Sequence, residues 1–276
     1  MAGGASAAVP TAAWAIIGGT GTHAVDLPSL LPRARVLERD LVFATPWGES
    51  PAFALFELDG RRVLHVRLHG WREGVRRGRA SRQVFSVLHR AGVATVFSDA
   101  GVGSLNHLLD PGDMVVADDF VDMTTDRDRD GLVVGGRLLI MREPVCPMAR
   151  AALADAVREV APERRLFTRG TYVVTEGPRF ESPAEVRRLQ LHGDIVGQSL
   201  VPEVWLARDI GACYAGLYVV VNYGEGVVRE WEHGVLEHIY RHDAQVLGTV
   251  LLEALASTPL DPSCRCRELR PDSLLR

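Results

Sequence analysis

CYAGLYVVVN, residues 213–222, is a long apolar run that ends in an asparagine. Runs of this kind, rich in Val and Tyr, are typical of a strand that is buried on both faces. A second apolar run leads into EGPRFES, residues 176–182, where Glu181 has a similar setting. In an α/β sheet, ligands bind beyond the carboxyl ends of the strands. Glu181 and Asn222 therefore either cap the ends of elements or bind a ligand.

Short apolar runs alternate with longer segments of helical periodicity along the rest of the chain. This alternation predicts a single α/β domain with a central mixed, mostly parallel sheet flanked by helices. The expected strands are residues 13–17, 62–68, 94–99, 113–121, 170–177 and 213–222, and the expected helices are 81–92, 146–161, 182–193 and 234–256. We expect residues 1–13 to be a disordered tail, 14–258 to form the domain and 259–276 to be a C-terminal tail.

Composition and charge restrict the classes of function. The chain has 276 residues, of which 47% are hydrophobic and 24% charged, enough to bury a full core. A net charge of −4 argues against a nucleic-acid or anionic-membrane partner, and no apolar stretch is long enough to span a membrane. All 31 basic residues are arginine, which excludes a lysine Schiff base. The chain has four cysteines, Cys146, Cys213, Cys264 and Cys266, and their spacing is not that of metal ligands. We therefore expect a reduced, cytoplasmic setting and no metal site.

Three predicted strands are followed by residues that suit an anion. GGTG, residues 18–21, offers bare backbone amides and the Thr20 hydroxyl. Arg67 and His69 follow the second strand and could clamp a phosphate, the arginine as a bidentate cation. DAGVGSL, residues 99–105, predicts a second glycine-rich turn with free amides. Taken alone, these features are better explained as a tight turn, a surface arginine and a capping histidine.

Together these segments resemble a known family. IIGGTG, RLHG, AGVGSL, PGDMVVADDFVD, EGPRFES, DIVGQSLVPEVWLARD and YVVVNYGEG, in this order, are similar to the trimeric purine nucleoside phosphorylase and methylthioadenosine phosphorylase family, over residues 15–256. The resemblance implies that phosphate cleaves a purine N-glycosidic bond, which releases the base and a ribose 1-phosphate. It also implies a homotrimer, with inorganic phosphate as co-substrate and no cofactor.

The resemblance assigns roles to individual residues. It places phosphate at Thr20, Arg67, His69, the backbone of Ala100 and Gly101, and Ser199. It places the purine at Phe180, Glu181 and Asn222, and implies that Asn222, Glu181 and His69 are catalytic. Family members that act on 6-aminopurines carry carboxylates where this chain has Asn222 and Gly224. An amide can donate to O6 and accept from a protonated N7, and Glu181 can accept from N1–H, so the pair predicts a 6-oxopurine site.

The sugar side departs from the family pattern. Gln198 stands where the family has a methionine against the ribose, and the 70–79 loop is altered, so that Trp71 either stacks near the sugar or only packs. His233 suggests a 5′-hydroxyl, whereas Val235 and Leu236 suggest a methylthio or deoxy group. The 5′ substituent therefore stays open.

Two classes of function remain at this point. The first is phosphorolysis of a 6-oxopurine nucleoside: inosine, guanosine or a 5′-methylthioinosine type. The second is a relative with lost or redirected catalysis, which binds or cleaves an unusual nucleoside; Gln198 and the altered loop favour it. A hydrolase is a weaker rival, because hydrolysis gains nothing from keeping the four phosphate side chains Thr20, Arg67, His69 and Ser199 together.

Overall fold

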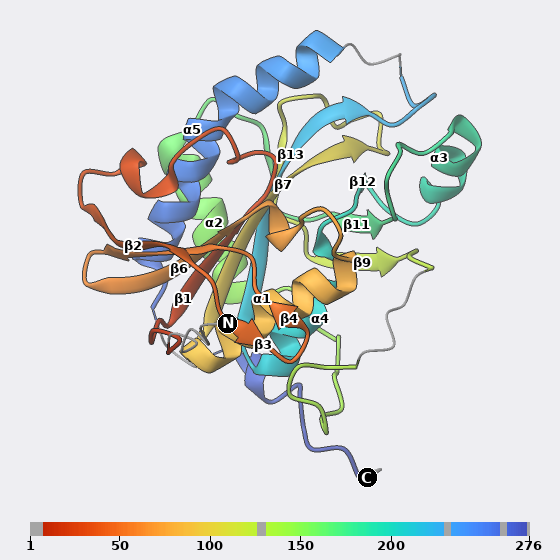
Figure 1. Ribbon diagram of the computed structural model, residues 1–276. Helices are drawn as coiled ribbons and strands as arrows, with labels where there is room; N and C mark the ends of the chain where they lie inside the picture. Colours follow the sequence, from red (N-terminus) through yellow and green to blue (C-terminus); the bar gives the residue numbers. More distant parts are fainter. Residues whose placement is uncertain (1–7, 126–130, 229–232, 260–263, 275–276) are drawn as a thin grey trace.

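The computed structural model describes residues 8–125, 131–228, 233–259 and 264–274 (Figure 1). They form one α/β domain around a mixed sheet of eleven strands, which confirms the predicted fold class. The main path of the sheet is β10-β8-β13-β7-β1-β6-β5-β2, and β12, β11 and β9 branch from β7. The strands of the sheet are β1 (Trp14–Gly18), β2 (Ala34–Leu41), β5 (Phe53–Leu58), β6 (Arg61–Arg67), β7 (Thr95–Ser104), β8 (Met114–Val115), β9 (Asp119–Asp122), β10 (Leu166–Phe167), β11 (Thr171–Val174), β12 (Ile195–Gly197) and β13 (Cys213–Tyr223).

The centre of the sheet is a parallel group of four strands. β1 pairs with β6 and β7, and β7 pairs with β13 along almost its whole length. Every residue of β13 is buried, as its uninterrupted apolar run predicts. β5 and β2 extend the sheet in antiparallel fashion beyond β6, and a small separate hairpin is formed by β3 (Ala44–Thr45) and β4 (Gly48–Glu49). Parallel strands with apolar residues on both faces require a helical layer on each side.

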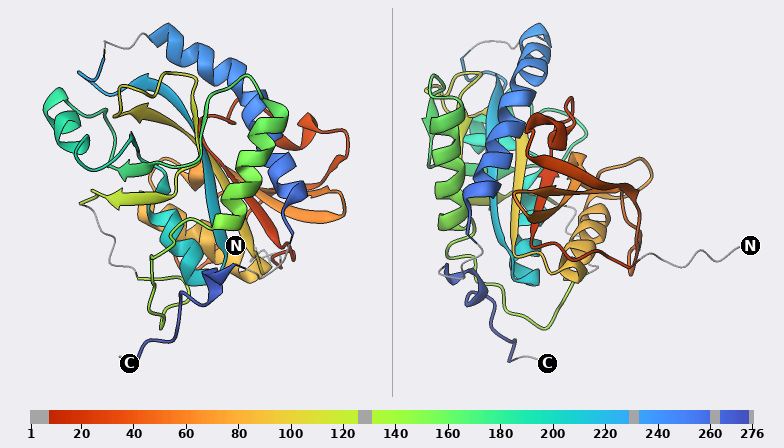
Figure 2. Two further views of the ribbon diagram at one scale, coloured as in Figure 1. Left: turned by 180° about the vertical axis from the view of Figure 1, so that it is seen from behind. Right: turned by 90° about the vertical axis from the view of Figure 1, so that its left-hand side faces the viewer.

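Helices supply those two layers. α2 (Pro147–Val160) and α5 (His233–Ser257) cover one face, whereas α1 (Arg77–Ala91) and α4 (Leu200–Ile210) cover the other (Figure 2). α3 (Pro183–Leu189) lies beside the β11 and β12 branch, where it helps to enclose a smaller apolar cluster. None of the helices in the described residues combines the length and apolar character needed to cross a membrane.

Several predicted elements differ from those observed. The expected strand 113–121 is two short strands, because β8 pairs with β13 and β10 whereas β9 pairs with β11 in the branch. DAGVGSL is not a turn, because pairing with β13 keeps the chain extended to Ser104. Sequence patterns did not indicate β2, β5, β12 or α4. β2 is largely exposed, β12 has three residues, and α4 contains Pro202, a residue that disfavours helix interiors.

Described residues of both expected tails pack on the domain. Residues 1–7 lie outside the described part, but Ala12 is buried and its N–H donates to the carbonyl of Ala91 at 3.1 Å. At the other end, the N–H of Ile140 donates to the carbonyl of Leu269 at 2.9 Å. The C-terminal segment 264–274 therefore packs on the domain.

The fold also brings all four cysteines together. Their Sγ atoms lie within 4.8 Å of one another, although the residues are far apart in the sequence: Cys146, Cys213, Cys264 and Cys266, called here the cysteine cluster. Sequence spacing gives no sign of this proximity, because the four thiols come from three separate segments.

Candidate functional site

The candidate site is a pocket of about 300 Å³ at the carboxyl ends of the central strands. β7 pairs with β1 as far as Ser98 and with β12 from Gly103 onward, so residues 99–102 face the gap between these two neighbours. Such a split in strand order is where open α/β sheets bind ligands. The predicted site residues that line this pocket are Thr20, His69, Trp71, Ala100, Gly101, Phe180, Glu181, Gln198, Ser199 and Asn222.

The GGTG turn is held by a buried carboxylate that sequence reasoning did not identify. Asp99 accepts hydrogen bonds from the N–H of Gly19 at 2.9 Å, the N–H of Thr22 at 3.0 Å and the Thr22 hydroxyl at 2.7 Å. A Cβ on Gly19 would lie 2.0 Å from the carbonyl oxygen of Asp99, so only glycine fits there. Asp99 thus fixes the turn that presents Thr20 to the pocket.

His69 reaches the pocket through a left-handed turn directly after β6. Leu68, His69 and Gly70 have φ angles of 50°, 54° and 71° in succession. Non-glycine residues seldom adopt this region, which costs on the order of 1–2 kcal/mol per residue. Strain of this kind persists only where the surroundings hold it, and here a side-chain contact does so.

That contact is a buried hydrogen bond between His69 and Glu203 of α4. The Nδ1–H of His69 donates to a Glu203 carboxylate oxygen at 2.8 Å, and the hydroxyl of Tyr214 donates to the other oxygen at 3.0 Å. Glu203 is only 1% exposed. Because a carboxylate only accepts, Nδ1 must carry the proton, and the imidazole orientation is set.

The free face of His69 points to the pocket. Its Nε2 has no hydrogen-bond partner among the described residues, and a Cβ on Gly19 would lie 2.9 Å from it. Burial lowers the pKa of His69, but the charge and hydrogen bond of Glu203, together with the charge of Asp99, outweigh burial, so the net pKa is raised. His69 is therefore suited to present an imidazolium N–H to an anion.

Arg67 does not join this site, which corrects its expected role. Its side chain is half exposed and lies 3.8 Å from the Asp26 carboxylate and 3.5 Å from the carbonyl oxygen of Val25. The prediction rested on the Arg–x–His pair at the end of a strand and on the family resemblance. β6 ends at Arg67, and the left-handed turn that follows directs His69 elsewhere. The described residues that line the pocket include no arginine.

The remaining predicted phosphate groups surround the same region. The hydroxyls of Thr20 and Tyr240, a residue of α5, are hydrogen-bonded, and the N–H of Gly101 donates to the Thr20 hydroxyl at 3.4 Å. A Cβ on Gly101 would lie 2.7 Å from the Tyr240 hydroxyl, so glycine is required. Ser199 is buried, and its hydroxyl is hydrogen-bonded to that of Tyr172 at 3.0 Å.

Asn222 faces the pocket because of an irregularity in β13. The register with β7 shifts between Val220 and Asn222, so Val221 is an extra residue, and both Val221 and Asn222 line the pocket. Bulges of this kind often redirect side chains next to active sites. The Nδ2 of Asn222 donates to the carbonyl of Tyr223 at 2.8 Å, which leaves its Oδ1 and second N–H available to a ligand.

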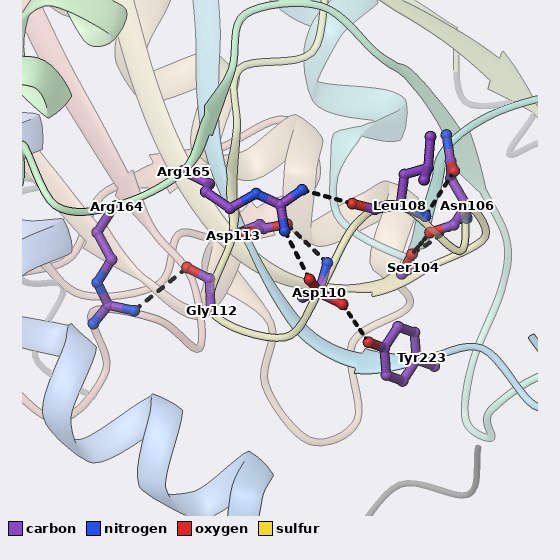
Figure 3. A network of polar contacts seen from close by, with 9 residues as sticks. All are labelled: Ser104, Asn106, Leu108, Asp110, Gly112, Asp113, Arg164, Arg165 and Tyr223. Carbon is purple, nitrogen blue, oxygen red and sulfur yellow. Dashed lines mark hydrogen bonds and ion pairs between the residues drawn. The ribbon is translucent and has the colours of Figure 1, made fainter. Parts of the chain in front are cut away.

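A polar network holds the carboxyl end of β13 in place (Figure 3). The hydroxyl of Tyr223 donates to Asp110, which also accepts from Arg165 at 2.7 Å. Arg165 further donates to the carbonyl of Leu108 at 2.8 Å and lies 3.3 Å from Asp113. Tyr223 is thereby tied to the loop between β7 and β8. The neighbouring Asn222 gains a fixed position.

Glu181 and Phe180 occupy the segment that leads into α3. Ser182 is the N-cap of α3 and forms a capping box with Glu185, so the alternative that Glu181 caps this helix is wrong. Glu181 instead accepts from the hydroxyl of Thr175 at 2.5 Å and lines the pocket. Phe180 is 54% exposed, and an aromatic ring at a pocket wall can stack on a flat base.

Gln198 and Trp71 lie between this pocket and a second one. The Gln198 Nε2 donates to the carbonyl of Arg179 at 3.2 Å, which gives this polar side chain a partner in the 176–182 segment. Trp71 is 41% exposed, with its ring 6.2 Å from that of His69. Both residues also line a neighbouring space of about 900 Å³, called here the side cleft, whose apolar lining is Trp71, Val75, Val201, Pro202 and Trp205.

The predicted 5′ residues fall at the start of α5. The side chains of His233, Val235 and Leu236 lie outside the described residues. Their assignment to the 5′ group stays a prediction.

Sequence reasoning missed four residues that shape the site: Asp99, Thr175, Glu203 and Tyr240. Glu203 lies in VPEVWLARD, where an acidic residue among apolar ones is a detectable sign of a buried charge pair. Its partner, however, is 134 positions away. Asp99 and Tyr240 carry no local signal, because their contacts are with residues far away in the sequence. Thr175 contacts Glu181 only six residues further on, but a lone threonine does not mark such a role.

The sequence model of the phosphorylase superfamily matches residues 14–256. The chain belongs to this superfamily. Among its relatives, a "Probable 6-oxopurine nucleoside phosphorylase" of Dictyoglomus turgidum is 32% identical over 262 residues, which cover 92% of this chain and 94% of that protein. A "Probable S-methyl-5'-thioinosine phosphorylase" of Methanothermobacter thermautotrophicus is 36% identical over 215 residues, covering 77% and 72%.

Solved structures of this superfamily share the fold. The crystal structure of a methylthioadenosine phosphorylase from an antarctic soil metagenomic library gives a TM-score of 0.76 at 28% identity, and the match covers 94% of this chain and 91% of that one. The same superfamily thus includes proteins named for 6-oxopurine and for 6-aminopurine nucleosides.

The first prediction separates His69 from Arg67. His69→Ala should raise the KM for phosphate by roughly 10- to 100-fold, because a hydrogen bond to a charged group contributes about 1.5–3 kcal/mol. Arg67→Ala should leave that KM within about twofold, since its guanidinium is directed at Asp26. Steady-state kinetics at saturating nucleoside measures both. A large effect of Arg67→Ala with none of His69→Ala would contradict the site described above.

The second prediction concerns pH. The pKa of His69 is raised, so its imidazolium persists above the ordinary histidine range, and the KM for phosphate should rise only as the pH passes that raised pKa. Glu203→Gln removes the main cause of the raised pKa, so the same rise should begin at a lower pH. Both proteins experience the same ionisation of phosphate, which serves as the internal control. Superimposable pH profiles would remove Glu203 from this role.

Proposed function

We propose that this protein catalyses phosphorolysis of 6-oxopurine nucleosides to the free base and a ribose 1-phosphate. The observation that carries the proposal is that the Asn222 amide, on the β13 bulge, shares one pocket with Glu181 and with His69, whose ring is held by Glu203. The relatives named for 6-oxopurine and thioinosine phosphorolysis support it.

The anion side of the pocket supplies donors and one cation. Phosphate would receive hydrogen bonds from His69 Nε2–H and from the hydroxyls of Thr20 and Ser199, with the backbone near Ala100 and Gly101 beside them. His69 would supply the positive charge when protonated, and Glu203, buried behind it, orients the ring and raises its pKa. Preorganised donors of this kind stabilise charge in the transition state without reorganising.

Residues on the base side of the pocket would contact the leaving purine. As the glycosidic bond breaks, the sugar gains positive charge, which the bound phosphate stabilises, and the purine gains negative charge. Asn222 can donate to O6 and accept from a protonated N7, while Glu181 accepts from N1–H. A 6-amino group would present a donor to the amide N–H of Asn222. The arrangement therefore favours inosine and guanosine types over adenosine types.

Hydrolysis is the second candidate, and the position of Arg67 favours it, because the phosphate region has lost the arginine that sequence reasoning placed there. Hypoxanthine release from inosine, measured with and without phosphate, distinguishes the two reactions. We expect release to require phosphate and ribose 1-phosphate to appear by ³¹P NMR. Free ribose formed without phosphate would establish hydrolysis instead.

The third prediction concerns base preference. The unmodified protein should cleave inosine-type nucleosides with higher kcat/KM than adenosine-type nucleosides, and Asn222→Asp should reduce that ratio at least about tenfold, because a carboxylate repels O6 and accepts from a 6-amino group. The chain has one other asparagine, and Asn106→Asp outside the pocket is the matched control. A preference for adenosine types in the unmodified protein would contradict the proposed role of Asn222 and leave the superfamily assignment intact.

We also propose that the protein is a homotrimer, with a second copy seated in the side cleft. The cleft combines an apolar part with charged groups from Arg72, Arg76, Arg77, Arg82, Asp122 and Glu176. It shares Trp71 and Gln198 with the candidate site, so a chain seated there would complete the pocket. Apolar surfaces next to a binding site commonly mark interfaces between proteins.

The fourth prediction tests this assembly. Sedimentation should give the mass of a trimer at micromolar concentration. Val75→Glu, which puts a charge into the side cleft, should shift the protein toward monomer and lower its activity. Leu191→Glu, at a residue 81% exposed and away from the cleft, should change neither. A fully active monomer would contradict the proposal.

A further inference from the structure

The cysteine cluster lies far from the candidate site. Cys213 is the first residue of β13, whereas Asn222 lies near the opposite end of the same strand. Cys146 immediately precedes α2, and Cys264 and Cys266 belong to the C-terminal segment, where a short helical turn spans Arg265–Arg267. The cluster therefore joins a helix, the central strand and the end of the chain.

The distances between the thiols fit a common ligand. Four thiolates at about 2.3 Å from a tetrahedral zinc ion lie roughly 3.8 Å from one another. All Sγ atoms here lie within 4.8 Å of one another, and those of Cys213 and Cys264 are 3.1 Å apart. That separation exceeds a disulfide bond, which is about 2.05 Å long. A small outward shift of this pair would give the tetrahedral spacing.

The surroundings suit a closed structural site. Cys146, Cys213 and Cys266 are buried, and the half-buried Cys264 leaves a route of entry for an ion. The backbone N–H groups of Met148 and Ala149 donate to the sulfur of Cys146. Hydrogen bonds from backbone amides to a ligand sulfur orient it and stabilise its anionic form. Thiolates in a buried site need a compensating cation, because burying unpaired charge is costly.

The segments that carry the thiols are already fixed. The N–H of Cys146 donates to the carbonyl of Tyr214 at 2.9 Å, and Arg208 donates to the carbonyl of Cys266 at 2.8 Å. Beyond Cys266, the N–H of Leu138 donates to the carbonyl of Pro271 at 2.9 Å. An ion held by all four sulfurs would add a cross-link where three segments meet.

We propose that Cys146, Cys213, Cys264 and Cys266 form a four-thiolate site for a structural zinc ion, which ties the C-terminal segment to α2 and β13. Soft thiolate ligands in a tetrahedral set select zinc over the hard cations magnesium and calcium. The proposal is independent of the nucleoside pocket, because the two sites lie at opposite ends of β13.

The test uses the full chain, reduced and then freed of metal. Titration with zinc should reach one ion per chain by elemental analysis, and titration with cobalt(II) should give the intense visible absorption bands of a tetrahedral thiolate complex. Cys264→Ser and Cys266→Ser should each abolish or strongly weaken those bands. Met148→Leu, in the same neighbourhood with all four thiols kept, should bind as the unmodified protein does.

Stability and activity give a second measurement. A chelator should lower the Tm of the zinc-loaded protein and leave that of Cys264→Ser unchanged, while nucleoside cleavage well below either Tm stays within about twofold. Thiols that bind neither zinc nor cobalt after full reduction would overturn the proposal, whether the isolated protein carried them free or as two disulfides. Because the cobalt titration uses the unmodified chain, a variant that fails to fold does not affect this outcome.

Discussion

The buried pair of His69 and Glu203 is the interaction on which the site depends. Burial of a carboxylate that is 1% exposed is costly, and the hydrogen bonds from His69 and Tyr214 compensate for it. The pair connects the turn after β6 to α4. It holds a left-handed turn that Leu68 and His69 would not adopt alone. Removing one partner would leave an uncompensated buried group, which typically costs about 3–5 kcal/mol.

The same pair determines how charge is distributed in the pocket. With Arg67 directed at Asp26, the described lining offers no guanidinium, and His69 is the group in it whose pKa is shifted toward the charged form. Glu203 makes this possible by raising the pKa of His69 against the effect of burial. Across the pocket, the bulge at Val221 turns Asn222 inward. The left-handed turn thus positions His69 on the anion side of the pocket, and the bulge positions Asn222 on the base side.

Local patterns predicted the features that depend on neighbouring residues. The apolar run of β13 indicated a buried strand, and the helical periodicity of residues 182–193 indicated a helix where α3 is found. Patterns failed where a contact crosses the fold. Arg67 was assigned to phosphate from its place at a strand end and from the family resemblance, whereas its guanidinium lies at Asp26. DAGVGSL was taken as a turn because its glycines are visible in the sequence, whereas its pairing with β13 is not. The cysteines have no metal-ligand spacing, yet three segments bring their sulfur atoms together.

The central claim is that His69, held by Glu203, contacts phosphate while Asn222 contacts the purine. A crystal structure of the protein with hypoxanthine and phosphate bound tests it most directly. The account predicts phosphate oxygens within hydrogen-bond distance of His69 Nε2 and the hydroxyls of Thr20 and Ser199, with O6 and N7 of the base at Asn222. Phosphate bound by Arg67, or a base turned away from Asn222, would contradict it.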